Sequence, residues 1–127
     1  MTDPIRILIA EDDRDAALTL TTLLREEGYE VHAVYSGRYV MGGVIDVDPD
    51  VVLLDINLPD QSGFEVAQAI KQRRRNPRPM LIGISGEHIQ GSDKLLAGII
   101  GFDHYLLKPY DLGALLALIA PLRASQI

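Results

Sequence analysis

Short aliphatic runs recur along this chain, and the segments between them carry apolar residues at every third or fourth position. Runs such as Ile7-Leu8-Ile9-Ala10 and Val51-Val52-Leu53-Leu54 contain no alternating polar positions. That pattern is typical of strands that are buried on both faces of a parallel sheet. We expect strands at Arg6–Ala10, Glu30–Val34, Val51–Asp55, Met80–Ser85 and His104–Leu107.

Helical periodicity fills the segments between these strands. The first helix is expected at about Arg14–Glu27 and is ended by Gly28. Its expected buried face consists of Leu18, Leu20, Leu23 and Leu24. The other helices are expected at Arg38–Val47, around Phe64 to Ile70 with an end in Lys71–Arg75, at Asp93–Ile100, and behind an Asp111 cap at Leu112–Leu122. The second helix is the weakest, because Gly42-Gly43 costs ~1 kcal/mol per glycine relative to alanine.

Strands and helices that alternate throughout predict an α/β fold. We expect a doubly wound parallel sheet with helices on both faces and right-handed crossovers. The length of 127 residues suits a single domain over residues 1–127. No linker, repeat or low-complexity segment interrupts the pattern.

Composition removes several classes of function. The chain has no cysteine, which excludes disulfides and thiolate metal sites. A net charge of −6 argues against nucleic-acid binding by this domain. The apolar runs are far shorter than the ~20 residues of a membrane helix, so we expect no membrane contact. Met1-Thr2-Asp3-Pro4 does not resemble the start of a signal peptide, and a cytoplasmic location is expected.

Reactive polar residues follow several of the expected strands. Glu11-Asp12-Asp13 follows the first strand, Asp55 ends the third, and Lys108-Pro109 follows the fifth. Ser85, at the end of the fourth, is a weaker case. The carboxyl ends of the strands in an open α/β sheet line its ligand crevice. These side chains, distant in sequence, are therefore expected to meet at one edge of the sheet.

The expected cluster suits a divalent cation and a phosphoryl group. The carboxylates of Glu11, Asp12 and Asp55 repel one another unless a cation neutralises them. Oxygen ligands without histidine or cysteine favour Mg²⁺ or Mn²⁺. A carboxylate can also carry an aspartyl phosphate, and Asp55 is the best candidate because it ends the most apolar strand. Lys108 and Ser85 would then contact phosphoryl oxygens. A simpler role stays open for Asp12 or Asp13, as the N-cap of the first helix.

The motifs in this order resemble those of the receiver domains of two-component response regulators, and the resemblance covers nearly the whole chain. Its segments are Ile7-Leu8-Ile9-Ala10-Glu11-Asp12-Asp13, Val51 to Gly63 with Asp55-Ile56-Asn57-Leu58-Pro59, Ile82-Gly83-Ile84-Ser85-Gly86, and Tyr105-Leu106-Leu107-Lys108-Pro109. The resemblance implies a flavodoxin-like (βα)5 fold with a five-stranded sheet in the order 2-1-3-4-5.

The resemblance also implies roles for individual residues. Asp55 would be the phosphoacceptor, and Lys108 would pair with the phosphoryl group. The implied metal ligands are Asp55, Asp12, the backbone carbonyl of Asn57 and, through water, Glu11. Asp13 falls outside this set. The implied switch residues are Ser85 and Tyr105, and the residues implied to modulate the lifetime of the phosphoryl group are Asn57 and Glu87.

A signalling mechanism follows from the same resemblance. Asp55 would attack a phosphohistidine of a histidine kinase or histidine phosphotransfer protein, in a reaction that needs Mg²⁺. The protein would be an enzyme only in promoting its own phosphorylation and dephosphorylation. Ser85 would then move inward and Tyr105 would turn in. This would repack the face formed by the fourth helix, the fifth strand and the fifth helix, where a homodimer would form.

Two other functions and two origins stay open. A docking module that works without phosphorylation would have no need for Glu11, Asp12, Asp55, Ser85 and Lys108. A haloacid-dehalogenase-like phosphatase also uses a strand-end aspartate and Mg²⁺, but Asn57 stands where such enzymes carry their general acid. The chain is either a stand-alone regulator or a receiver from a hybrid sensor histidine kinase, which the segment Gly101 to Pro109 resembles.

Overall fold

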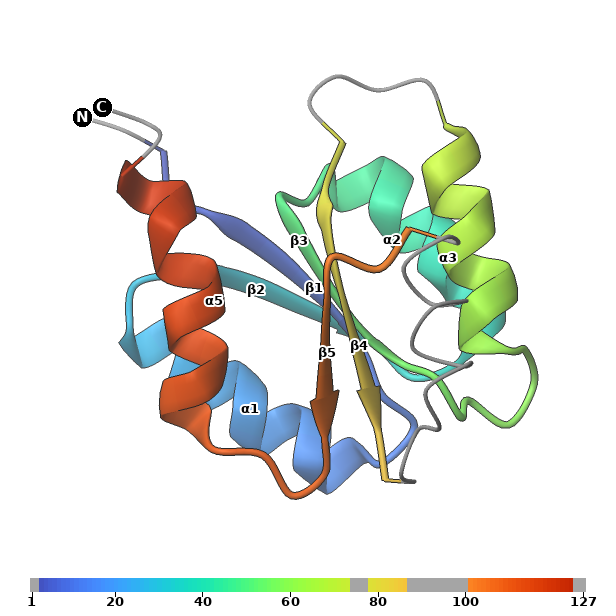
Figure 1. The fold of residues 1–127 in the computed structure, drawn as a ribbon, viewed down its shortest axis with the longest axis horizontal. Coiled ribbons are helices and arrows are strands. Elements are labelled where there is room, and N and C mark those ends of the chain that lie inside the picture. The colour runs from blue at the N-terminus through green and yellow to red at the C-terminus, as the bar shows by residue number, and fades with distance from the viewer. Residues whose placement is uncertain (1–2, 74–77, 87–100, 125–127) are drawn as a thin grey trace.

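The structure, a computed structural model, is a five-stranded parallel sheet between two layers of helices (Figure 1). It describes residues 3–73, 78–86 and 101–124. The strand order is β2-β1-β3-β4-β5, as expected. The five strands have the expected bounds, β1 Arg6–Ala10, β2 Glu30–Val34, β3 Val51–Asp55, β4 Met80–Ser85 and β5 His104–Leu107.

The helices of the described residues cover both faces of the sheet. Figure 1 shows α1 and α5 on one face and α2 and α3 on the other. Their bounds are α1 Arg14–Glu26, α2 Val40–Val47, α3 Gly63–Gln72 and α5 Leu112–Ala124. The helix expected at residues 93–100 lies outside the described residues. None of the described helices is long and apolar enough to cross a bilayer.

The core consists of two clusters, one on each face of the sheet, because successive side chains of a strand point to opposite faces. Leu8 and Leu54 pack toward α2 and α3, whereas Ile7 and Leu53 pack toward α1 and α5. Every residue of β3 is buried, so Asp55 ends the most enclosed strand of the described sheet. This enclosure fixes the position of Asp55 relative to its neighbours.

The buried face of α1 differs from the one expected. Ala17, Thr21 and Leu24 are buried, whereas Leu18 is 66% exposed and Leu23 is 36% exposed. Residues at i, i+4 and i+7 share one face of a helix, and Leu18 lies about 100° around the helix from Ala17. The prediction of a leucine face was therefore wrong for Leu18 and Leu23.

The second helix starts in a tighter form than expected. A 3₁₀ turn, Gly37–Tyr39, precedes α2, so the α-helix begins at Val40 rather than Arg38. Within α2, a Cβ atom added at Gly43 would lie 3.1 Å from a methyl carbon of Leu8 in β1, whereas one added at Gly42 would meet nothing within 4 Å. Gly43 thus allows α2 to lie close to the sheet. No close contact requires a glycine at position 42.

The two glycines should respond differently to alanine. Gly42→Ala is expected to raise the free energy of unfolding by about 0.5–1 kcal/mol, because alanine has the better helix propensity and nothing crowds the new methyl group. Gly43→Ala should gain at most half as much, because its methyl group presses on buried Leu8. Urea unfolding of both variants measures the difference, and a Gly42→Ala protein less stable than wild type would contradict the expectation.

The ends of three helices also refine the expected bounds. Gly28, with a φ of 93°, follows α1 as the expected left-handed residue. The third helix ends at Gln72 and Arg73 is extended, so the helix is shorter than expected. The last helix continues to Ala124, past the expected end at Leu122.

Candidate functional site

The register of the parallel strands brings the chemically active residues to one edge. Ala10 pairs with Leu54, so Glu11 follows β1 beside Asp55. Asp55 itself pairs with Ile84, next to Ser85. Ser85 in turn pairs with Leu107, which precedes Lys108. The expected convergence of these residues is therefore confirmed.

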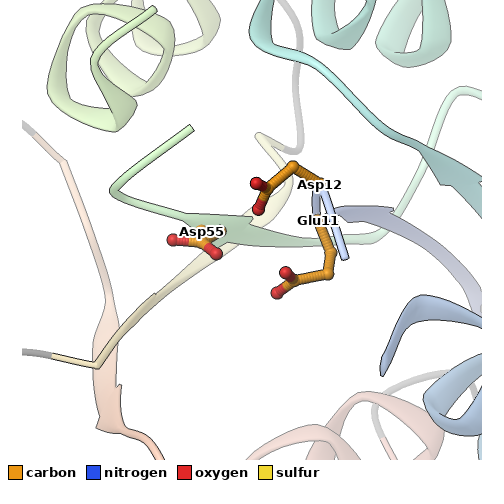
Figure 2. Close-up of side chains that lie close together, drawn as sticks. All are labelled: Glu11, Asp12 and Asp55. Carbon is orange, nitrogen blue, oxygen red and sulfur yellow. The ribbon is translucent and has the colours of Figure 1, made fainter. Parts of the chain in front are cut away.

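Three carboxylates form the centre of this edge. Glu11, Asp12 and Asp55 each have a carboxylate oxygen within 4.8 Å of those of the other two (Figure 2). Glu11 and Asp55 are buried, with exposed fractions of 7% and 5%, whereas Asp12 is exposed. The cluster is therefore enclosed at Glu11 and Asp55 and open to solvent at Asp12, where a cation could enter.

Lys108 is the cation that balances the buried carboxylates. Its Nζ atom donates to Glu11 Oε2 at 2.8 Å and to Asp55 Oδ2 at 3.1 Å. Burial alone would lower the pKa of Lys108, but the hydrogen bonds to Glu11 and Asp55 outweigh burial and leave that pKa raised. Lys108 therefore carries its charge at neutral pH, directly beside Asp55.

Burial disfavours the ionised form of the Glu11 carboxylate. Burial raises its pKa, and the charge of Asp55 raises it further. Hydrogen bonds from Lys108 and from the backbone N–H of Asp13, at 3.1 Å, offset this only in part. A cation at this site would favour the ionised form of Glu11.

Asp55 is oriented by its own loop. The backbone N–H of Asn57 donates to Asp55 Oδ1 at 2.9 Å, while Lys108 occupies Oδ2. The side-chain amide of Asn57 donates to the Ser85 hydroxyl oxygen at 3.3 Å. Asn57 thus connects the carboxylate of β3 with the hydroxyl of β4.

Asp13 lies outside the cluster, as expected. It is the N-cap of α1, and its side chain accepts a hydrogen bond from the backbone N–H of Ala16 at 3.1 Å. The open choice between a capping role for Asp12 and for Asp13 is thereby resolved in favour of Asp13.

Tyr105 lies in β5, beside the site rather than in it. Its ring is half-buried and packs edge-on against Phe102, with the ring centroids 6.0 Å apart. A Cβ atom at Gly83 would lie 3.0 Å from the Tyr105 ring, so this glycine gives the ring its place over β4. Glu87 lies outside the described residues.

The loop between β3 and α3 makes one contact that the sequence did not predict. Asp60, in the loop between β3 and α3, accepts hydrogen bonds from the backbone N–H groups of Gly37 at 2.7 Å and Arg38 at 3.0 Å. These two donors lower the pKa of Asp60. Because the partners are 22 and 23 positions away in the chain, no local pattern could have indicated the contact.

A cleft opens beside the cluster. It has a volume of about 520 Å³ and lies between the start of α1 and the segment after β5. Glu11, Asp13 and Lys108 contribute its charged groups, and Leu20 and Tyr110 are among its apolar walls. Of the three clustered carboxylates, Glu11 lines this cleft, and Lys108 lines it beside Glu11.

The donor set fits a hard divalent cation. All three clustered side chains offer carboxylate oxygens, and within the part of the chain that the structure describes no histidine joins them. Oxygen ligands of this kind are those that Mg²⁺ and Mn²⁺ prefer. A bound divalent ion would also relieve the repulsion between Glu11 and Asp55. The site therefore combines a carboxylate cluster that suits a divalent cation, the strand-end carboxylate of Asp55 and the lysine ammonium of Lys108.

Comparison with known proteins places these features in one family. The family model described as the response regulator receiver domain matches residues 7–120. A receiver domain protein from Methanospirillum hungatei is 27% identical, with a TM-score of 0.85, and the match covers 98% of this chain and 97% of that one. A two-component response regulator from Clostridium difficile is 26% identical, with a TM-score of 0.85 and coverage of 97% and 99%. A receiver domain from Methylobacillus flagellatus is 27% identical, with a TM-score of 0.80 and coverage of 94% and 98%.

Proposed function

The chain belongs to the response regulator receiver domain family, and from this premise we propose that it is a switch operated by phosphorylation of Asp55. Members of this family are signalling switches rather than conventional enzymes, and they work by phosphorylation-dependent signalling. The observation that carries our proposal is the meeting of Asp55 with Glu11, Asp12 and Lys108 at one edge of the sheet.

In the proposed reaction the Asp55 carboxylate attacks the phosphorus atom of a phosphohistidine in line, and the bond to the histidine nitrogen breaks. The phosphorylated protein carries an acyl phosphate on Asp55. Lys108, whose ammonium is already beside Asp55, stabilises the negative charge of the transferred group. A bound Mg²⁺ or Mn²⁺ would supply further charge neutralisation, held by Asp55, Asp12, the Asn57 carbonyl and, through water, Glu11.

We propose that Ser85 and Tyr105 convert phosphorylation into a change of shape. The Ser85 hydroxyl oxygen accepts a hydrogen bond from the Asn57 side-chain amide, and on phosphorylation the hydroxyl would donate its own proton to the phosphoryl group. Tyr105 would then turn toward the space that Ser85 vacates. The two conformations would differ in population rather than in fold. Asn57 and Glu87 would influence how long the phosphoryl group survives.

The proposed partner is a histidine kinase or a histidine phosphotransfer protein. We propose a cytoplasmic location, where such a kinase finds ATP, and a homodimer through the face that contains β5 and α5 as one output. Residues 1–127 would act as a single domain that contacts neither nucleic acid nor membrane. The origin, stand-alone regulator or receiver of a hybrid kinase, does not alter this chemistry.

Two alternatives make different predictions. A phosphorylation-independent docking module would bind its partner equally well without Mg²⁺ and without a phosphodonor. A haloacid-dehalogenase-like phosphatase would turn over added phosphomonoesters repeatedly. Lys108, held between two carboxylates at the site, favours the switch over a pure docking module, because such a module has no use for a buried charge cluster.

The test is phosphorylation with a small donor. Incubation with acetyl phosphate and Mg²⁺ is expected to add one phosphoryl group that is labile to base and to hydroxylamine, as acyl phosphates are. Intact-mass spectrometry detects the group, and peptide analysis should place it on Asp55. Chelation of Mg²⁺ should abolish the reaction. A stable adduct on a hydroxyl group, or none at all together with no binding of Mg²⁺, would contradict the proposed function.

A further inference from the structure

Asp60, in the loop between β3 and α3, hydrogen-bonds to the backbone at the 3₁₀ turn that precedes α2. One carboxylate oxygen of Asp60 accepts the Gly37 N–H at 2.7 Å, and the other accepts the Arg38 N–H at 3.0 Å. These N–H groups open the 3₁₀ turn that leads into α2, and Ser36, at the N-cap position, makes no side-chain capping bond. Asp60 therefore caps this turn from a different loop.

Backbone packing strengthens the same junction. A Cβ atom at Gly37 would lie 2.6 Å from the Cβ of Gln61, closer than two such atoms can approach, so only glycine fits here without a shift. Beneath this contact, Ile56 and Leu58 of the loop share a core cluster with Val40 of α2. The loop and the start of α2 thus form one packed unit.

The inner side of the loop lies at the phosphoacceptor. The Asn57 N–H donates to Asp55 at 2.9 Å, and the Asn57 side chain donates to Ser85. The loop closes on itself through a bond from the Gly63 N–H to the Ile56 carbonyl at 3.0 Å, and a Cβ atom at Gly63 would lie 2.6 Å from the Ile56 Cα. In a turn this compact, we expect a displacement of Asp60 to move Asn57 as well.

We propose that Asp60 is a positioning residue for the metal and phosphoacceptor site, because its bonds to residues 37–38 hold the loop that presents Asn57 to that site. The inference rests on the proposed function, in which the Asn57 carbonyl is a metal ligand. Groups that orient the ligands of a metal affect its affinity without touching it. Asp60 would act in this way through the main chain of its loop.

The first experiment compares Asp60→Ala with wild type. The variant is expected to bind Mg²⁺ about 10-fold more weakly by isothermal titration calorimetry, and to accept phosphate from acetyl phosphate more slowly. Hydrogen exchange of the Gly37 and Arg38 amides should accelerate. Asp60→Asn keeps one acceptor oxygen and should recover part of the Mg²⁺ affinity.

A matched control uses Asp50, whose carboxylate accepts the Arg6 N–H at 2.9 Å in the same kind of side-chain-to-backbone bond. Asp50 precedes β3, at the edge of the sheet opposite to the site. Asp50→Ala should therefore cost stability but leave the Mg²⁺ affinity of the folded protein unchanged.

Two more variants separate positioning from helix capping. Ser36→Asp in the Asp60→Ala background offers the turn a cap from its own chain, so it should restore thermal stability while Mg²⁺ affinity stays low. Gly37→Ala, which leaves Asp60 intact but pushes on Gln61, should weaken Mg²⁺ binding by itself.

The outcomes also separate this inference from the proposed function. If Asp60→Ala binds Mg²⁺ as tightly as wild type, or if Ser36→Asp restores the affinity fully, Asp60 acts only as a helix cap. Either result would overturn this inference but leave the proposed function intact. A wild-type protein that neither binds Mg²⁺ nor accepts phosphate would overturn both.

Discussion

Asp55→Asn is expected to lower the rate of phosphorylation by acetyl phosphate at least ~10³-fold, the scale of loss seen when a catalytic nucleophile is removed. A neutral amide cannot attack phosphorus. Glu11 is a poor substitute, because burial raises its pKa and so favours the protonated form, which is not a nucleophile. Asp12 is exposed and more accessible, but Lys108 makes its two carboxylate contacts with Glu11 and Asp55.

The fold should survive this substitution. The amide oxygen of asparagine can still accept the Asn57 N–H, and the change removes one negative charge from a crowded group. Asp50→Asn is the matched control, since it makes the same chemical change at the opposite edge of the sheet. Intact-mass kinetics measure the rate for each protein. Transfer to another carboxylate at the wild-type rate would show that Asp55 is not the phosphoacceptor.

Lys108→Met is expected to separate metal binding from phosphorylation. The variant keeps an unbranched apolar side chain but loses the ammonium that lies 3.1 Å from Asp55. The rate of phosphorylation should fall by about 10²- to 10³-fold, as when one group that stabilises a developing anion is removed. Mg²⁺ affinity should rise several-fold instead, because the resident cation no longer repels the ion.

The pH dependence of Mg²⁺ binding should also change in Lys108→Met. The hydrogen bond from Lys108 lowers the pKa of Glu11 against the effect of burial, so that pKa will rise when the bond is lost. A metal binds the ionised carboxylate, and its affinity therefore falls as Glu11 takes up a proton. Between about pH 8 and pH 5, calorimetry should show a steeper loss of affinity in the variant than in wild type.

Lys71→Ala, on α3, serves as the charge control for Lys108→Met. It removes one positive charge without touching the cluster, so both the phosphorylation rate and the Mg²⁺ affinity should stay within about twofold of wild type. Equal effects from the two lysines would mean that net charge, and not the position of Lys108, sets the behaviour of the site.

The strands and the convergence of the site could be predicted from the sequence because both follow from local signals. A run such as Val51 to Leu54 has no polar position, and a parallel sheet places the end of each such run at one edge. The exposure of Leu18 could not be predicted, because α1 offers more apolar positions than its buried face needs. Contacts between distant loops, such as Asp60 with Gly37, leave no periodic pattern at all.

The hydrogen bonds of Lys108 within the cluster could not be predicted from the sequence either. Lys108 and Glu11 are 97 positions apart, and the motifs indicate only that both reach the same edge. That Lys108 donates to Glu11 as well as to Asp55 depends on side-chain geometry, which the strand register alone does not determine.

Because the strand register brings the reactive residues to one edge of the sheet, the connections at the opposite edge can vary in length without disturbing that alignment. A residue added inside β3 would turn Asp55 to the other face, whereas residues added between Asp48 and Asp50, before β3, would leave the alignment of Ala10 with Leu54 intact. Lengthening such a connection costs little free energy. New termini or a whole inserted domain could therefore be engineered there, giving a sensor whose readout is fused at one edge while phosphate is received at the other.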